Sequence, residues 1–190
     1  MVFDENTQSC DLTIEFGPAT DLAKELDIQD AGLYSCLNNS GYIWKEQVTS
    51  LGCYGSEALD FSELANVTTL TSFEVYDVQS DALDLSKLSN LSTLRVSNSY
   101  NLTNLTLPQS KKLEALMLNG LNLTNETLDN SGISALTNLK RLELNDNALV
   151  KFDASPLTQL EYLSVYHNDI KELVITGNTL LEELNADNNP

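Results

Sequence analysis

The sequence predicts a leucine-rich repeat solenoid, an α/β-type right-handed superhelix whose short parallel strands form one concave sheet. One phrase, Leu-x-x-Leu-x-Leu, recurs seven times at intervals of 22, 21, 22, 26, 21 and 21 residues, and such a period is the signature of these repeats. Apolar residues at the fourth and sixth positions alternate with polar ones, as in a strand with one buried face. The seven copies, and so about seven strands, begin at Val48, Leu70, Leu91, Leu113, Leu139, Leu160 and Leu181.

The return path of each repeat is predicted to be mostly irregular. One strand cannot bury its apolar side alone, so the copies stack around a shared core. A repeat of 21 residues leaves little room for a helix, and we expect turns, short strands and 3-10 segments on the convex side. The longest repeat carries its extra residues within 122–135, where 125–132 can start a helical turn. This insertion is either a tolerated surface bulge or a recognition feature.

Asparagine follows the strand in the last three copies only, at Asn147, Asn168 and Asn189. An asparagine side chain can bond backbone groups where the chain turns out of a strand. We therefore expect an asparagine ladder toward the C-terminal half, with looser or differently bonded turns in the earlier copies.

Residues 1–47 do not repeat, and we expect them to form a leading segment with a helical cap before the repeats of residues 48–190. Helical spacing predicts one helix over 21–26, with Asp21 as its N-cap, and a second over 27–37. The cap would cover the open end of the first strand. Trp44 is either part of this seal or an exposed anchor for a ligand. The residues expected to seal the strand are Leu33, Leu37, Ile43 and Trp44.

The three cysteines, Cys10, Cys36 and Cys53, all lie in the first 53 residues. We predict a disulfide between Cys36 and Cys53, which would join the leading segment to the first repeat. Closing a loop of this size would contribute about 3 kcal/mol. The alternatives are a reduced, buried pair and a bond from Cys10 to either partner.

Side chains that alternate with the buried leucines are predicted to face the concave side, where equivalent positions of successive repeats form rows. Aromatic and arginine residues are favoured at binding hot spots, and they gather toward both ends of these rows. The candidate ligand-binding residues are Tyr54, Glu74, Tyr76, Arg95, Met117, Arg141, Glu143, Tyr162, Tyr166 and His167.

The chain carries a net charge of −18, from 28 acidic and 10 basic residues. This charge disfavours nucleic acid and anionic membrane surfaces as partners. It either keeps an extended surface soluble or attracts a basic partner or divalent cations. No apolar stretch is long enough to cross a bilayer, so membrane insertion is not expected.

The sequence predicts neither an enzyme nor a cofactor. Its only histidine, His167, has no nucleophile motif beside it, and Glu182 and Glu183 point to opposite sides of a strand. There is no close cysteine pair for zinc. Calcium is the one metal considered, because several oxygen-bearing side chains fall at strand ends, although they also suit turns. These residues are Asn145, Asp146, Asp187 and Asn188.

Parts of the chain resemble secreted or surface bacterial leucine-rich repeat proteins of the internalin-like class. Residues 33–36, 41–44 and 48–53 are similar to the N-terminal cap and first repeat of that class, and 64–75 and 136–147 are similar to its repeat phrase. The resemblance implies an extracellular or cell-surface protein, whose signal peptide is presumed removed, that uses its concave sheet to recognise a protein or a glycan in adhesion.

Three functional hypotheses follow. The first is a non-enzymatic recognition module that binds a protein or glycan on its concave face. The second is a structural module, in which an uncapped C-terminal edge packs against another copy or a following domain; we expect the natural chain to continue past Pro190 or that edge to meet another chain. The third is an intracellular scaffold or effector, which reduced cysteines would favour.

Overall fold

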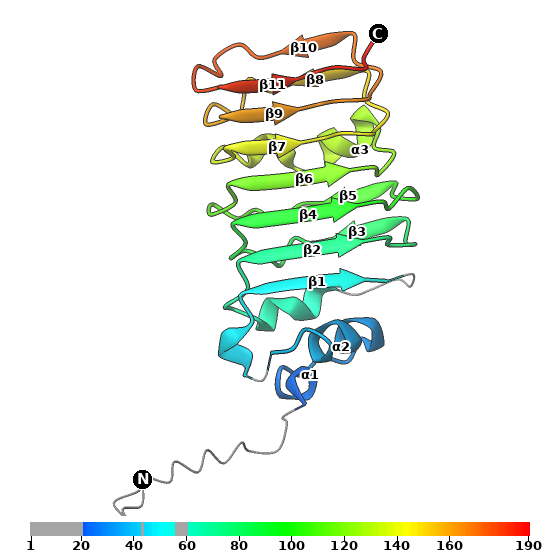
Figure 1. Cartoon of the computed structure of the whole chain (residues 1–190), viewed down its shortest axis with the longest axis vertical. Helices are drawn as coiled ribbons and strands as arrows, with labels where there is room; N and C mark the ends of the chain where they lie inside the picture. The colour runs from blue at the N-terminus through cyan, green and yellow to red at the C-terminus, as the bar shows by residue number, and fades with distance from the viewer. Residues whose placement is uncertain (1–20, 43, 56–60) are drawn as a thin grey trace, which may run out of the picture.

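The computed structural model describes residues 21–42, 44–55 and 61–190. Seven parallel strands form one continuous sheet in the order β1-β2-β4-β6-β7-β9-β11, and Figure 1 shows them stacked along the long axis of the molecule. This confirms the predicted solenoid and its strand number. The strands are β1 (Ser50–Tyr54), β2 (Ser72–Tyr76), β4 (Thr93–Ser97), β6 (Ala115–Asn119), β7 (Arg141–Glu143), β9 (Tyr162–Ser164) and β11 (Glu183–Asn185).

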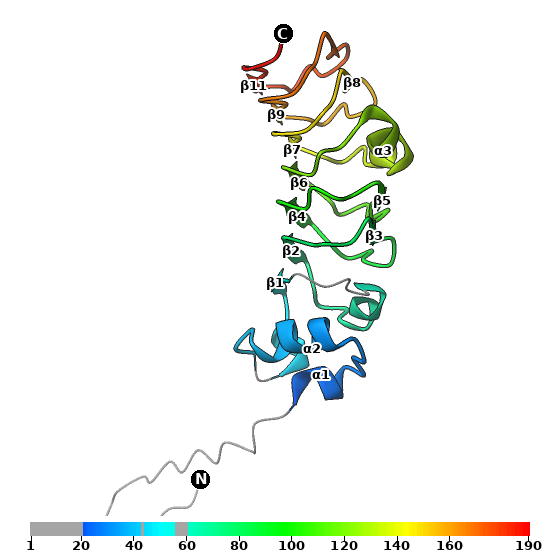
Figure 2. The same cartoon turned by 90° about the vertical axis from the view of Figure 1, so that its right-hand side faces the viewer.

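A second, less regular layer forms the return path. Two pairs of short parallel strands lie there, β3-β5 and β8-β10. Figure 2 shows β3, β5 and β8 on one side of a gently curved sheet, whose other, open face is concave. The predicted mixture of short strands, turns and 3-10 segments is therefore present. Its elements are β3 (Ala82–Asp84), β5 (Asn104–Thr106), β8 (Lys151–Asp153), β10 (Glu172–Val174), α3 (Asn125–Asn130) and the 3-10 helices η2 (Phe61–Asn66) and η3 (Ile133–Ala135).

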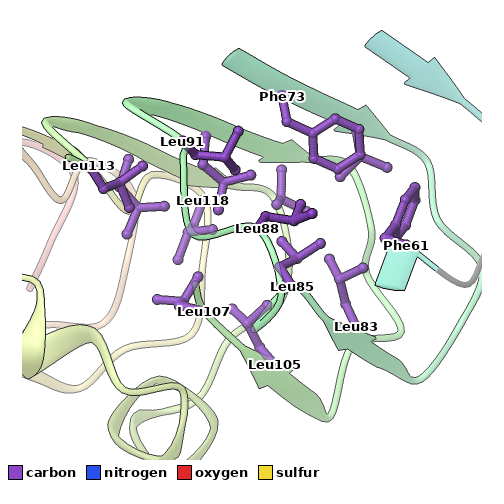
Figure 3. Packing of buried hydrophobic residues seen from close by; sticks show 14 of the residues in the cluster. Phe61, Phe73, Leu83, Leu85, Leu88, Leu91, Leu105, Leu107, Leu113 and Leu118 are labelled. Atoms are coloured by element: carbon purple, nitrogen blue, oxygen red, sulfur yellow. The ribbon is translucent and has the colours of Figure 1, made fainter. Parts of the chain in front are cut away.

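The core lies between these two layers. From β1 to β9 the strands of the sheet bury their alternating apolar side chains, as Leu51 and Cys53 do on β1 and Phe73 and Val75 do on β2; Leu184 on β11 is exposed. Leucines of the return path meet them from the other side (Figure 3). The rings of Phe61 and Phe73 pack edge to face with centroids 5.2 Å apart. The repeats therefore share one continuous interior, which is what makes each strand stable beside its neighbours.

The asparagine ladder is present in the C-terminal half. Asn168 is buried; its amide nitrogen donates to the backbone carbonyls of Leu144 and Val165, and its oxygen accepts from the backbone N–H of Leu149. Asn147 and Asn189 make the equivalent bonds in their own repeats. Earlier, the hydroxyl of Ser99 accepts from the backbone N–H of Val78 instead. The expected contrast between late and early turns is confirmed.

The helical cap is also present, with one boundary corrected. Helix α1 (Leu22–Glu25) is N-capped by Asp21, as predicted. The second helix, α2 (Ala31–Asn38), begins four residues later than expected, because Asp27 takes a left-handed φ of 55° that ends the first helix and turns the chain. Helix α2 packs against β1, and a disulfide joins Cys36 to Cys53 with 5.3 Å between their Cα atoms.

Trp44 does not seal the cap. Leu33 and Leu37 are fully buried there, but Trp44 is 51% exposed. The chain turns at this point into η1 (Lys45–Gln47), and the backbone N–H of Trp44 donates to the side chain of Gln47. Ile43 and Cys10 lie outside the described residues.

The insertion of the long repeat forms helix α3. The side chain of Thr124 caps it by accepting from the backbone N–H of Thr127. Asn125 ties the helix to the next repeat: its oxygen accepts from the backbone N–H of Val150, and its nitrogen donates to the carbonyl of Lys151. The predicted helical turn is confirmed, and it is built into the convex layer.

Candidate binding face of the sheet

The strand register places the predicted rows on the open face of the sheet. Tyr54 pairs with Tyr76 in register, and Glu74 with Arg95. Farther along, Arg141 pairs with Tyr162. Neighbouring strands lie about 4.8 Å apart, so residues at equivalent positions touch one another. The open face therefore carries two separate clusters of aromatic and charged side chains, one near each end.

The N-terminal cluster consists of Tyr54, Tyr76, Glu74 and Arg95. The two tyrosine rings are stacked, with centroids 5.1 Å apart and planes 5° apart. The hydroxyl of Tyr76 donates to Glu74 at 2.9 Å, and Arg95 lies 3.8 Å from the same carboxylate. Tyr54 is 75% exposed, while burial and the bond to Glu74 raise the pKa of Tyr76. The cluster is thus an exposed aromatic surface held in one arrangement.

The C-terminal cluster consists of Arg141, Glu143, Tyr162 and Tyr166. The guanidinium of Arg141 lies 3.7 Å from the centroid of the Tyr162 ring, a cation–π arrangement, and donates to Glu143 at 2.6 Å. Glu143 also accepts from the Asn119 side chain. Tyr166 accepts a hydrogen bond from Asn188 through its hydroxyl. Hydrogen bonds thus hold Arg141, Glu143 and Tyr166, and the cation–π contact with Arg141 holds the Tyr162 ring, before any ligand arrives.

Met117 is a correction to the predicted site. It lies on the open face as expected, between Arg95 and Glu143 in the row, but it is only 5% exposed. Long side chains on both neighbouring strands flank it, which accounts for its burial. Glu143 is partly covered too, because its two oxygens are taken by Arg141 and Asn119. Met117 and Glu143 therefore offer a ligand little contact surface.

His167 is a second correction, since it lies in a turn and not on a strand. Strand β9 ends at Ser164, and His167 has a left-handed φ of 52°. Its Nδ1 lies 2.7 Å from a carboxylate oxygen of Asp146, and its ring contacts that of Tyr166 at 5.9 Å between centroids. It therefore borders the C-terminal cluster at the edge of the sheet.

The position of His167 belongs to a series that sequence reasoning missed. The eighth position of every repeat from Leu70 onward takes a left-handed φ, a conformation that glycine, asparagine, aspartate and histidine adopt more readily than most residues. The recurrence of these residue types at the eighth position of successive repeats could have predicted this backbone conformation from the sequence. The series reads Asp77, Asn98, Gly120, Asp146, His167 and Asn188.

No metal site is evident in the described part of the chain: no three histidine, cysteine, aspartate or glutamate side chains gather there in a metal-binding group. Calcium binding at Asp146 or Asp187 therefore stays an untested expectation. In the same residues, no helix has the length and apolar character needed to span a membrane.

Comparison with known proteins supports the fold. No family model and no curated protein matches the sequence. Among solved structures, an internalin (inlF) from Listeria monocytogenes is similar at 22% identity and a TM-score of 0.52, covering 84% of this chain and 63% of that one. InlP from the same organism matches at 16% identity and a TM-score of 0.41, over 89% of this chain and 66% of that one.

The chain thus spans somewhat less than two thirds of the length of these two structures. A plant receptor kinase ectodomain from Arabidopsis thaliana, GASSHO1/SCHENGEN3, solved in complex with CASPARIAN STRIP INTEGRITY FACTOR 2, is similar at 20% identity and a TM-score of 0.41, over 74% of this chain and 20% of that one. At these identities the comparisons bear on architecture. The similarity to inlF, together with the seven-stranded parallel sheet and its repeat pattern, identifies the chain as a leucine-rich repeat solenoid with an internalin-like fold.

Proposed function

We propose that this chain is a non-enzymatic recognition domain that binds a protein partner on the open face of its sheet. The observation that supports this most directly is the pair of aromatic and arginine clusters, which no other described element of the chain covers. Tyrosine and arginine are enriched at the centres of protein interfaces. The stacked Tyr54–Tyr76 pair and the Arg141–Tyr162 pair present such groups in fixed positions.

The internal bonds of each cluster support binding in a second way. Ordering a long side chain on association costs about 0.5–1.5 kcal/mol. Arg141 is already held by Glu143 and Tyr162, and Tyr76 by Glu74 and Tyr54. Much of this cost has therefore been met when the chain folds, and a partner would gain correspondingly in affinity.

We further propose that the domain acts outside the cell, at a surface or in secreted form, where adhesion is the most natural role for such a face. The disulfide between Cys36 and Cys53 suits an oxidising compartment and disfavours an intracellular scaffold or effector. The net charge of −18 would favour partners with basic surfaces.

Affinity capture from cell-surface and secreted fractions tests the proposal. The full chain is compared with Tyr54→Ala/Tyr76→Ala and Tyr162→Ala/Tyr166→Ala, and with Asn104→Ala/Thr106→Ala, two exposed residues on the convex strand β5. A partner found by mass spectrometry is then purified and titrated. At least one tyrosine pair should weaken its binding about tenfold or more, a loss of about 1.4 kcal/mol, while the convex pair leaves it unchanged. Affinity that no open-face variant alters would remove this face as the interface.

A second candidate function is assembly through the last repeat. Ile175, Leu180 and Leu184 are 40%, 47% and 43% exposed, and Leu184 lies on β11, so the end of the sheet presents apolar surface. Such surfaces are commonly covered by another element or another chain. Under this alternative a second copy covers it, and the protein is a dimer or larger in solution.

Measurement of mass by light scattering separates the two candidates. A monomer at about micromolar concentration would exclude strong self-association. A dimer that Leu180→Asp/Leu184→Asp converts to a monomer, and that Tyr162→Ala/Tyr166→Ala leaves intact, would instead establish assembly through this end.

A further inference from the structure

A groove of about 490 Å³ lies beside the open face, where β4, β6, β7 and β9 end. These strand ends are the arrowhead side of the sheet in Figure 1. The volume is in the range of small-molecule sites. The groove is distinct from both aromatic clusters, although its rim reaches His167. The lining residues on which the argument depends are Asn98, Tyr100, Gly120, Asn122, His167 and Asp169.

The groove is lined mainly by the eighth-position residues of four copies (Asn98, Gly120, Asp146 and His167) and by the tenth-position residues of three of them (Tyr100, Asn122 and Asp169). Gly120 holds the eighth position in the middle of the groove. Its missing side chain leaves space there, since a Cβ would lie 3.3 Å from the Asn98 oxygen and 3.5 Å from the Tyr100 hydroxyl. Tyr100 stands on one side and Asp169 on the other. From β4 to β9 there are three strand steps, about 14 Å, which is room for more than one sugar ring.

The groove offers hydrogen-bonding groups that the fold does not use. Within the described residues, the side chains of Asn122 and Asp169 make no hydrogen bond, and the amide nitrogen of Asn98 has no partner; its oxygen lies 3.5 Å from the Tyr100 hydroxyl. By contrast, Asn168 at the base is fully engaged with backbone groups. Of the tenth-position residues in the groove, Tyr100 and Asp169 do not have a left-handed φ, whereas Asn122 has one of 57°.

The lining chemistry narrows the class of ligand. No lysine or arginine lines the groove, and Asp146 and Asp169 do, so an anion would be repelled. Tyr100, 61% exposed, is the one phenol ring in a lining that is otherwise polar and includes the imidazole of His167, so the groove is not an apolar site. The acidic groups are too few for a metal cluster in the described part of the chain.

We propose that this groove binds a neutral sugar. A sugar hydroxyl both donates and accepts, which matches carboxylates that accept and amides that do both. The C–H face of a pyranose ring can pack on an exposed tyrosine ring, whose body is apolar and whose hydroxyl is polar. Asp169 and Asn122 bind hydroxyl groups, and Tyr100 packs on the ring. This proposal does not depend on protein binding by the open face.

Two-dimensional ¹H–¹⁵N NMR of the full chain tests it, with glucose, galactose, mannose and N-acetylglucosamine and their methyl glycosides titrated to about 50 mM, a range that detects millimolar affinity. At least one of these probes should shift the backbone amides of Gly120, Asn122 and His167 in a saturable way. N-acetylneuraminic acid, which carries a carboxylate, should not.

Variants of exposed groove residues link the shifts to the site. Tyr100→Ala, Asn122→Ala and Asp169→Ala should each weaken sugar binding about fivefold or more, which corresponds to about 1 kcal/mol. Gln79→Ala is the matched control, because Gln79 holds the same tenth position in the repeat that begins at Leu70, outside the groove. It should bind as the unaltered chain does. Circular dichroism of every variant establishes that each is folded.

Three results would overturn the proposal. The first is that none of the neutral sugars shifts the groove amides in a saturable way. The second is binding that Tyr100→Ala, Asn122→Ala and Asp169→Ala all leave unchanged. The third is a shift of the same amides by calcium chloride alone or by N-acetylneuraminic acid, either of which would assign the groove to a charged ligand. None of these outcomes would affect the test of the aromatic clusters.

Discussion

The amide nitrogen of Asn168 donates to the backbone carbonyl of Leu144 in the preceding repeat at 2.8 Å. The same side chain accepts from the backbone N–H of Leu149 at 3.1 Å, and Asn168 is 7% exposed. Asn168 also donates to the carbonyl of Val165 in its own repeat, so one side chain satisfies backbone groups of two successive repeats. Neighbouring repeats are therefore joined by more than their apolar contacts.

Asn168→Ala should lower the free energy of unfolding by about 2–3 kcal/mol, because it leaves several buried backbone groups without partners. Chemical denaturation followed by circular dichroism measures the change. Asn101→Ala is the control, since Asn101 is exposed and its side chain makes no hydrogen bond in the described structure. Equal stability of the two variants would show that the ladder contributes little.

The disulfide between Cys36 and Cys53 closes a loop with a sequence separation of 17. Cys36→Ser/Cys53→Ser should lower the free energy of unfolding by about 3 kcal/mol, because the unfolded chain regains the freedom of that loop. Denaturation of the unaltered chain with and without reductant provides the comparison. Reductant should destabilise Cys10→Ser as much as the unaltered chain; if it no longer destabilises Cys10→Ser, a pairing through Cys10 is responsible.

Periodicity made the frame of this fold predictable. The alternation of Leu142 and Leu144 with polar neighbours follows from the two-residue period of a strand, and the repeat spacing sets which strands become neighbours. The rows of the open face then follow, so the contact between Arg141 and Tyr162 could be expected from their equivalent places in adjacent repeats. Cap residues Leu33 and Leu37 were likewise identified correctly.

Periodicity could not predict features that depend on the size of neighbouring side chains or on the local backbone conformation. Met117 occupies an outward position yet is covered, because the lengths of the flanking side chains decide its exposure. Trp44 is exposed because a short 3-10 helix redirects the chain. The groove beside Gly120 depends on a left-handed φ of 66° and on the small volume of glycine, and a search for apolar periods does not detect either feature.

Adjacent residues of β6 provide a test of the two faces of the sheet. Leu116 and Met117 are both buried, but only Leu116 belongs to the shared core. Leu116→Ala should cost about 3 kcal/mol, since it leaves a closed cavity. Met117→Ala should cost only about 1 kcal/mol, because solvent can fill the space on the open face. Chemical denaturation measures both, and equal losses would indicate that Met117 is packed as tightly as a core residue.

The pKa of Tyr76 provides a test of the N-terminal cluster in solution. Burial raises it most, followed by the hydrogen bond to Glu74 and the charge of that carboxylate. The neutral phenol is thus favoured in the folded state. Its contribution to stability is fully present below the unfolded-state pKa of about 10 and is lost as the pH rises through the folded-state pKa.

Ultraviolet absorbance titration of the unaltered chain, minus that of Tyr76→Phe, isolates the ionisation of Tyr76. The midpoint should lie above the ordinary tyrosine value, and Glu74→Gln should lower it, because the substitution removes a negative charge beside the phenol. Since Arg95 opposes the shift, Arg95→Gln should raise the midpoint further. A midpoint unaffected by Glu74→Gln would show that Tyr76 and Glu74 are not bonded in solution and that the N-terminal cluster is not held together before a partner binds.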